Sequence, residues 1–216
     1  MLTDDQLKTL SKKMNFPLEG CFFKDELPRK LKYNTGYIIN LDNSVDESGS
    51  LNEGSHWTCL FVQKYPKGQI EPIFFDPYGA PPSESVIKFV KDNCGKFLPY
   101  NNKDIQSLMN NACGWYCAAF LHYITTWEHR TKDLYTDVDT FLSYFDDLNK
   151  SIDWKKNEWI LSQFFQAKDP TRRKPIDVLS SIKEDDEEGG IDMMKIPVDV
   201  KFKTATPKDK LEALFV

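Results

Sequence analysis

The chain has 216 residues, 40% of them hydrophobic and 13% aromatic, a composition that predicts a globular protein with one substantial core. A formal net charge of -5 gives no general attraction to nucleic acid or anionic membranes, so we expect no DNA binding. No apolar run approaches a membrane span, and the charged N-terminal segment is not a signal peptide. Five irregularly spaced cysteines predict no disulfide framework and favour a reducing cytosol.

The first hundred residues are expected to form two helices and several strands. A helix begins after Thr3 or Asp4 and ends near Pro17. Two strand-like runs flank a short Pro-Lys-Gly-Gln turn and predict a β-hairpin over 56–77. The other segments are expected to be irregular chain at 18–34, a strand at 35–41, a solvent loop at 42–55 and an amphipathic helix at 83–95, with Val86, Ile87, Phe89 and Val90 facing inward and Gly95 ending it.

Further helices dominate the rest of the folded part. After a short strand within 96–108, a central helix begins near Cys113, and amphipathic helices follow at 136–150 and 153–166. The fold class predicted is therefore α+β, with helices packed on a mostly antiparallel central sheet. The predicted folded domain covers residues 1–167. Residues 168–216 are predicted to be a C-terminal extension, with a mobile acidic linker at 168–192, a strand at 196–202 and a short terminal helix.

The stretch from Gln106 to Tyr123 carries the first candidate site residue, Cys113. Apolar side chains recur after it with helical spacing and one buried stripe, and Asn110 and Asn111 are candidate N-caps. Cys113 then sits in the first turn, where unpaired N–H groups and the helix dipole favour a thiolate. Gly114 would leave one side of the sulfur uncovered. The alternative is that Cys113 is a small buried hydrophobe, which is the usual role of a cysteine in an apolar helix.

Only three histidines are available as a base. His129 lies among charges and is expected on the surface, whereas His122 is expected in the core or at its boundary. His56 opens a strand, and Asp76 ends the next one. Pairing as a hairpin places a carboxylate beside the imidazole, where it can orient the ring, although Asp76 alone is equally a turn residue before proline.

Gln106 is the fourth candidate. Seven residues before Cys113, its carboxamide is a candidate to lie beside the Cys113 backbone N–H. Two donors aimed at one point are what a tetrahedral oxyanion requires. Taken alone, a glutamine is more often simply solvated.

In order and spacing, these motifs resemble the adenovirus-type (adenain-like) maturation cysteine proteases, whose clan includes the SUMO deconjugases. The likeness covers about residues 15–127. Its motifs are His-Trp preceded by a glycine (Gly54 to Trp57), the Phe-acid-Pro-aromatic-Gly turn (Phe75 to Gly79), Gln106, and Ala-Cys-Gly-x-x-Cys (Ala112 to Cys117) before a Phe-Leu-His run. The four together, in order, make the signal specific.

The resemblance implies a papain-like or adenain-like fold with the nucleophile at the start of a central helix. It assigns Cys113 as nucleophile, His56 as general base and acid, Asp76 as orienting acid, and Gln106 with the Cys113 N–H as oxyanion hole. Asp76 stands where adenovirus enzymes carry Glu, as it does in the deconjugases. Trp57, Gly114 and Trp115 are candidate substrate-binding residues. For each of the two tryptophans, plain core packing is an equal alternative.

The same resemblance implies a substrate and a source. It suggests cleavage after small residues, such as Gly-Gly-X, in capsid or other virion precursor polypeptides of a virophage or other double-stranded DNA virus, in the virion and the host-cell cytoplasm. No cofactor or metal is implied, and the DNA and peptide activators of the adenovirus enzymes do not carry over. The chain itself contains Gly189-Gly190-Ile191, a candidate site of self-cleavage near Gly190.

Three other functions remain open at this point. A deconjugase of ubiquitin-like proteins would cut folded ubiquitin-like fusions rather than extended peptides. An inactive relative would serve as a binding or scaffold module, although all four catalytic positions are filled. A zinc site at Cys113, Cys117 and His122 lacks a standard ligand spacing.

Overall fold

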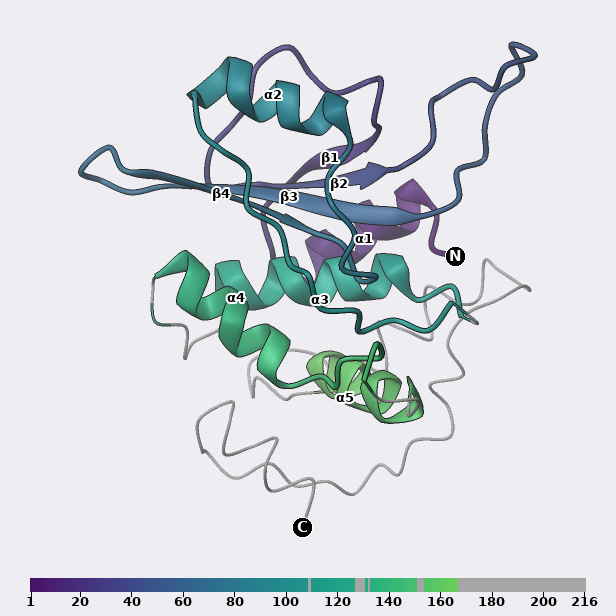
Figure 1. Cartoon of the computed structure of the whole chain (residues 1–216), viewed down its shortest axis with the longest axis vertical. Helices are drawn as coiled ribbons and strands as arrows, with labels where there is room; N and C mark the ends of the chain where they lie inside the picture. Colours follow the sequence, from purple (N-terminus) through teal and green to yellow (C-terminus); the bar gives the residue numbers. More distant parts are fainter. Residues whose placement is uncertain (109, 127–130, 132, 151–153, 167–216) are drawn as a thin grey trace.

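In a computed structural model, the described part of the chain is an α+β fold in which five helices pack around a four-stranded mixed sheet (Figure 1). The structure describes residues 1–108, 110–126, 131, 133–150 and 154–166. The elements, in chain order, are α1 (Asp4–Met14), β1 (Leu18–Phe23), β2 (Gly36–Asn40), β3 (Trp57–Lys64), β4 (Ile70–Phe75), α2 (Glu84–Cys94), α3 (Cys113–Thr126), α4 (Leu134–Ser143) and α5 (Trp154–Gln166).

The strands lie in the order β1-β2-β3-β4, with one parallel and two antiparallel pairings. The hairpin predicted over 56–77 is confirmed as β3 and β4, in a register that pairs Cys59 with Phe75. The prediction of irregular chain for 18–34 is wrong at its start, because residues 18–23 form β1. Leu18 pairs with Gly36 and Gly20 with Tyr37, so the ladder slips by one residue beside Gly20.

Both faces of the sheet are covered, which explains why β3 is buried from Trp57 to Val62. Trp57, Cys59 and Phe61 face the core shared with α1 and α3. Leu60 and Val62 point to the opposite face, where they pack with α2 residues such as Val90. Figure 1 shows α2 on one side of the sheet, with α1 and α3 on the other and α4 and α5 beyond α3.

Helix α3 is the centre of the larger core. Every residue from Cys113 to Ile124 is buried, so the prediction of a single buried stripe was too narrow. Contacts with β3, α1, α4 and α5 enclose the helix on all sides, which explains its apolar character on every face. Because a backbone enclosed in this way has little freedom to shift, the first residue of α3 is held in a fixed position.

The helix ends follow local chemistry. Thr3 and Gln6 form a capping box at the start of α1, and Gly95 ends α2 in the left-handed conformation, as predicted. Ile87 is 43% exposed, so its predicted inward position is wrong. Residues 96–108 form no strand, only a single bridge between Tyr100 and Phe74.

The predictions for residues 168–216 and for His129 lie outside the described residues. In the part of the chain that the structure describes, no helix is long and apolar enough to cross a membrane.

Candidate functional site

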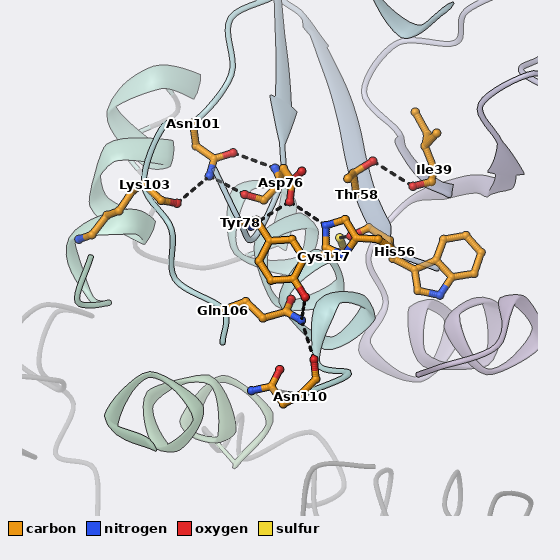
Figure 2. Close-up of polar contacts among 11 residues, drawn as sticks. Ile39, His56, Thr58, Asp76, Tyr78, Asn101, Lys103, Gln106, Asn110 and Cys117 are labelled. Atoms are coloured by element: carbon orange, nitrogen blue, oxygen red, sulfur yellow. Dashed lines mark hydrogen bonds and ion pairs between the residues drawn. The ribbon is translucent and has the colours of Figure 1, made fainter. Parts of the chain in front are cut away.

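The β3–β4 hairpin brings His56 and Asp76 together, as the sequence predicted. His56 directly precedes β3 and Asp76 directly follows β4, so the ladder sets their separation. The Nε2 atom of His56 lies 2.8 Å from Oδ1 of Asp76, and the His56 N–H donates to the carboxylate (Figure 2). The two side chains are only 7% and 1% exposed. A carboxylate in this position fixes the imidazole orientation and stabilises its protonated form.

Cys113 is the first residue of α3, and its thiol is near enough to His56 to act on the pKa of the imidazole. Since Nε2 is taken by Asp76, Nδ1 is the ring nitrogen able to exchange a proton with the thiol. Burial by itself lowers the pKa of His56, but the hydrogen bonds and charges of Asp76 and Cys113 outweigh it and raise that pKa to about 9. The imidazole is therefore protonated at neutral pH, which suits a thiolate–imidazolium pair.

Asn101 fixes the backbone that carries Asp76. Its Oδ1 accepts the Asp76 N–H at 2.8 Å, and its Nδ2 donates to the carbonyl oxygens of Asp76 and Lys103 at 2.7 and 3.2 Å (Figure 2). The turn that follows is equally constrained. Gly79 has φ +70°, and a Cβ there would lie 2.9 Å from the carbonyl carbons of Asn102 and Lys103. The acid is thus held from both sides. Sequence reasoning did not single out Asn101, because an asparagine in a polar loop carries no such signal.

Tyr78 contacts three of the four predicted catalytic residues. Its ring stacks on the imidazole of His56, with centroids 4.3 Å apart and 18° between the planes. Its backbone N–H donates to Oδ1 of Asp76 at 2.8 Å, and its hydroxyl accepts from Nε2 of Gln106 at 3.3 Å (Figure 2). From the sequence, Tyr78 is identified only as the aromatic residue of the turn motif from Phe75 to Gly79, with no separate role.

Gln106 lies beside these residues and is buried, but its amide hydrogens are already used. Nε2 donates to the backbone oxygen of Asn110 at 3.1 Å as well as to the hydroxyl of Tyr78. Its Oε1 atom is buried without a partner among the described residues. An oxyanion would therefore have to share or replace the longer of the two contacts, the one to Tyr78. The donor that the sequence predicted to be free for an oxyanion therefore already has two partners.

Asn110 lies three residues before α3, so neither it nor Asn111 is the N-cap that the sequence predicted; Ala112 holds that position, and its carbonyl accepts the N–H of Tyr116. Its Oδ1 accepts the N–H of Ala112 at 3.2 Å, and its Nδ2 donates to Glu158 on α5. The same residue therefore contacts the segment before α3, accepts a hydrogen bond from Gln106, and connects both to α5. This contact explains how a helix far along the chain helps to position the loop before Cys113.

The three candidate substrate-binding residues have packing roles in the described structure. The indole N–H of Trp57 donates to the backbone oxygen of Leu2 at 2.7 Å, and Trp115 packs edge-on against Phe165. Gly114 was expected to leave the sulfur open, but a Cβ there would lie 3.3 Å from side-chain atoms of Leu2 and Leu7. Its small size permits close packing with the start of the chain, so that expectation is corrected.

The remaining thiols and imidazoles offer no second centre. All five cysteines are free, and the Cys117 thiol donates to the backbone oxygen of Trp57. Burial raises the pKa of Cys117 well above its usual range, which keeps it a neutral core residue. His122 is buried and interacts with Thr126, as predicted for a core or boundary histidine. Within the described ranges, no three His, Cys, Asp or Glu side chains are placed to hold a metal ion.

Searches against models of known protein families and against curated protein sequences find no significant match to this chain.

Proposed function

We propose that this protein is a cysteine endopeptidase of the adenain-like type. The observation that carries the proposal is the contact series from Cys113 at the start of α3, through the His56 imidazole, to the Asp76 carboxylate. A nucleophile, a base and an orienting acid in this order are the parts that acyl transfer from a peptide bond requires. The sequence motifs that resemble the maturation proteases support the same reaction.

The first half of the reaction forms a thioester. The Cys113 sulfur attacks the carbonyl carbon of the scissile bond, and the carbonyl π electrons move to oxygen. The proposed donors to that oxyanion are the backbone N–H of Cys113 and the Gln106 carboxamide, whose Nε2 contacts the Tyr78 hydroxyl. When the tetrahedral adduct collapses, its C–N bond breaks and the imidazolium of His56 gives its proton to the departing amine.

The second half releases the acid product. Neutral His56 takes a proton from water, whose oxygen attacks the thioester carbonyl, and the C–S bond breaks to return the thiolate. Asp76 keeps the ring oriented through both halves because its Oδ1 accepts from Nε2. No cofactor enters any step of this proposal.

The proposed substrates are capsid or other virion precursor polypeptides of a virophage or other double-stranded DNA virus, cut after small residues such as Gly-Gly. The proposed place of action is the virion and the host-cell cytoplasm. These parts of the proposal rest on the resemblance of the motifs from Gly54 to Cys117. Net charge -5 also gives no reason to expect activation by DNA.

The decisive experiment is cleavage of a peptide library, with Cys113→Ala as the blank. We expect cuts after Gly-Gly or other small residues that the blank does not make. Cys113→Ala should also melt within a few degrees of wild type, because replacing a sulfhydryl with hydrogen leaves only a small cavity. Identical product patterns from the two proteins would end the endopeptidase proposal.

An inactive binding module is the second candidate, and two observations favour it. Cys113 is only 2% exposed, and both amide hydrogens of Gln106 are already used. A cysteine-directed probe such as iodoacetamide separates the candidates. An enzyme should be labelled at Cys113 much faster than at Cys21 or Cys94, whose pKa values are raised by burial. No labelling of Cys113 in native protein would favour the binding module.

A further inference from the structure

We propose that Tyr78 is a positioning residue that sets two groups of the reaction at once, holding the His56 ring by stacking and the Gln106 carboxamide by its hydroxyl. The inference rests on the proposed function, since it assigns a role within that reaction. It adds a fifth residue to the four that the sequence motifs indicated. That residue is joined to three of them by a ring contact and two hydrogen bonds (Figure 2).

The ring contact constrains the imidazole in the one direction that its hydrogen bonds leave open. The hydrogen bond to Asp76 lies in the plane of the ring, so it resists sliding but resists tilting only weakly. The Tyr78 ring lies nearly parallel to the imidazole, with an interplanar angle of 18°. It therefore closes one face of the ring and keeps both nitrogens directed at their partners.

The hydroxyl contact gives the Gln106 amide a second fixed partner. Asn110 offers a backbone carbonyl oxygen, which only the NH2 end of the amide can satisfy. The carbonyl therefore fixes nitrogen at this point, and the Tyr78 hydroxyl accepts the other hydrogen of the same nitrogen. Burial raises the pKa of Tyr78, so its hydroxyl stays protonated and its own hydrogen remains as a donor.

The turn geometry shows why this tyrosine can reach all three partners. Its backbone N–H is bound to the same Asp76 oxygen that receives His56. The next residue, Gly79, donates to the Asp76 carbonyl and lies against the backbone of Asn102 and Lys103. The Tyr78 backbone is thus fixed relative to the acid, and its side chain extends from there over the imidazole to Gln106.

Two substitutions separate the ring from the hydroxyl. Tyr78→Phe keeps the stacking and removes the contact to Gln106, so we expect kcat on a Gly-Gly-X peptide to fall about tenfold while KM holds. This is less than the 100- to 1,000-fold typical when an oxyanion donor is lost outright, because Asn110 still holds the other amide hydrogen. Tyr135→Phe, on α4, is the matched control. It also loses one hydroxyl contact, the hydrogen bond to the backbone oxygen of Pro72.

A double-mutant cycle tests whether the hydroxyl acts through Gln106. In a Gln106→Ala background, Tyr78→Phe should cause no further loss of kcat, because the group it positions is gone. A full additional tenfold loss would show that the hydroxyl works independently of Gln106 and would overturn this half of the inference. Wild-type kcat in Tyr78→Phe itself would overturn it equally.

The stacking half has a readout that needs no substrate. In the proposed reaction the imidazolium of His56 acts on the Cys113 sulfur, so we expect iodoacetamide to react with Cys113 even at pH 6, where His56 is protonated. The ionisable groups that act on His56 are Asp76 and Cys113, with the neutral Tyr78 over its face. Tyr78→Leu should loosen the contacts of the His56 ring with Asp76 and Cys113 and slow labelling at pH 6 several-fold. Mass spectrometry of the Cys113 peptide measures the labelling rate. Tyr78→Phe and Tyr135→Phe should label as wild type.

The two proposals fail in different ways. If no cleavage depends on Cys113, the endopeptidase proposal fails, while the labelling comparison still measures how Tyr78 holds His56. If Tyr78→Leu labels at pH 6 at the wild-type rate in protein with an unchanged far-ultraviolet spectrum, the stacking role is wrong. If it labels more slowly but its melting temperature falls no more than that of Tyr135→Phe, positioning rather than general unfolding is the cause.

Discussion

His56 carries the clearest electrostatic signature at the scale of single residues. Its partners raise its pKa from 6.5 to about 9 in the folded state. A base whose folded pKa exceeds its unfolded value gives stability that is complete below pH 6.5 and is lost as the pH rises through 9. We therefore expect the free energy of unfolding to fall by an amount on the order of 3 kcal/mol across this window, at 1.36 kcal/mol per pH unit.

Urea unfolding of wild type and His56→Gln at pH 6 and pH 9.5 checks this. The variant cannot take up the proton, so the stability difference between the two proteins should shrink as the pH rises. Other groups that titrate in this range contribute equally to both proteins and cancel. A difference that is the same at both pH values would contradict the assignment of the raised pKa to His56.

Gln106 has the most exacting test among the catalytic candidates. Gln106→Ala removes a carboxamide whose nitrogen meets Tyr78 and Asn110, and loss of an oxyanion donor costs roughly 100- to 1,000-fold in kcat. We expect a fall of that size with little change in KM, measured on the peptide that wild type cuts best. Normal turnover would show that Gln106 does not bind the oxyanion, and a donor other than Gln106 would have to act with the Cys113 N–H.

At the scale of elements, the turn after β4 depends on one glycine. Gly79 combines φ +70° with 2.9 Å approaches to the backbone of Asn102 and Lys103. Gly68 makes a matched control, since its φ is +88° but a Cβ there meets nothing within 4 Å. Gly68→Ala should cost about 1–2 kcal/mol for the strained conformation alone. Gly79→Ala should cost roughly 1–3 kcal/mol more, because the turn must also move.

Thermal unfolding and peptide cleavage report the two consequences separately. Gly79→Ala displaces the turn that carries Tyr78 and should lower kcat as well as stability, whereas Gly68→Ala, at the far end of the hairpin, should lower stability only. Equal stability losses in the two variants would mean that the close approach at Gly79 relaxes without cost.

Asn101 joins β4 to the loop that leads to Gln106. Its side chain makes three hydrogen bonds with the backbone of Asp76 and Lys103, and it is buried. Asn101→Ala should destabilise the protein by about 2–3 kcal/mol, because buried backbone groups lose their partners. Asn102→Ala, an exposed neighbour, should change the stability by less than about 0.5 kcal/mol. Chemical denaturation of both variants compares them directly.

The elements that could be predicted are those with a local signal. The hairpin, α1 and the start of α3 follow from turn residues, caps and hydrophobic period, and the pairing of His56 with Asp76 comes with the hairpin. β1 was missed because a parallel edge strand is defined by its distant partner β2, and Gly20 weakens its own pattern. The Gln106 contacts were unpredictable for the same reason, since they depend on where Tyr78 and Asn110 fold.

For the molecule as a whole, burial on every side of α3 is what makes the site rigid. The sheet, α1, α4 and α5 all contact this helix, and the Glu158–Asn110 contact extends that support to the loop before Cys113. Because all its faces are covered, α3 has apolar residues on every side and little amphipathic periodicity, although it is the helix on which the core is built. A cysteine fixed at the edge of so dense a core needs little reorganisation to react, which is the advantage of a preorganised site.

The acidic segment around Gly189-Gly190-Ile191 lies outside the described residues and supplies the last prediction. If the protein cuts after Gly-Gly, this segment offers it a substrate within its own chain. We expect purified wild-type protein, incubated alone, to lose the residues after Gly190, with the new end identified by intact-mass measurement. Cys113→Ala should stay full length in the same conditions.

Mixing the two proteins then distinguishes the route. Truncation of Cys113→Ala by added wild type would show that one molecule cuts another, whereas an uncut variant beside truncated wild type would show that each molecule cuts itself. Gly190→Val serves as the matched variant, because a branched side chain next to the scissile bond should block the cut in a site selective for small residues. A wild-type chain that keeps its full mass, although it cleaves Gly-Gly peptides, would rule out self-processing here without touching the endopeptidase proposal.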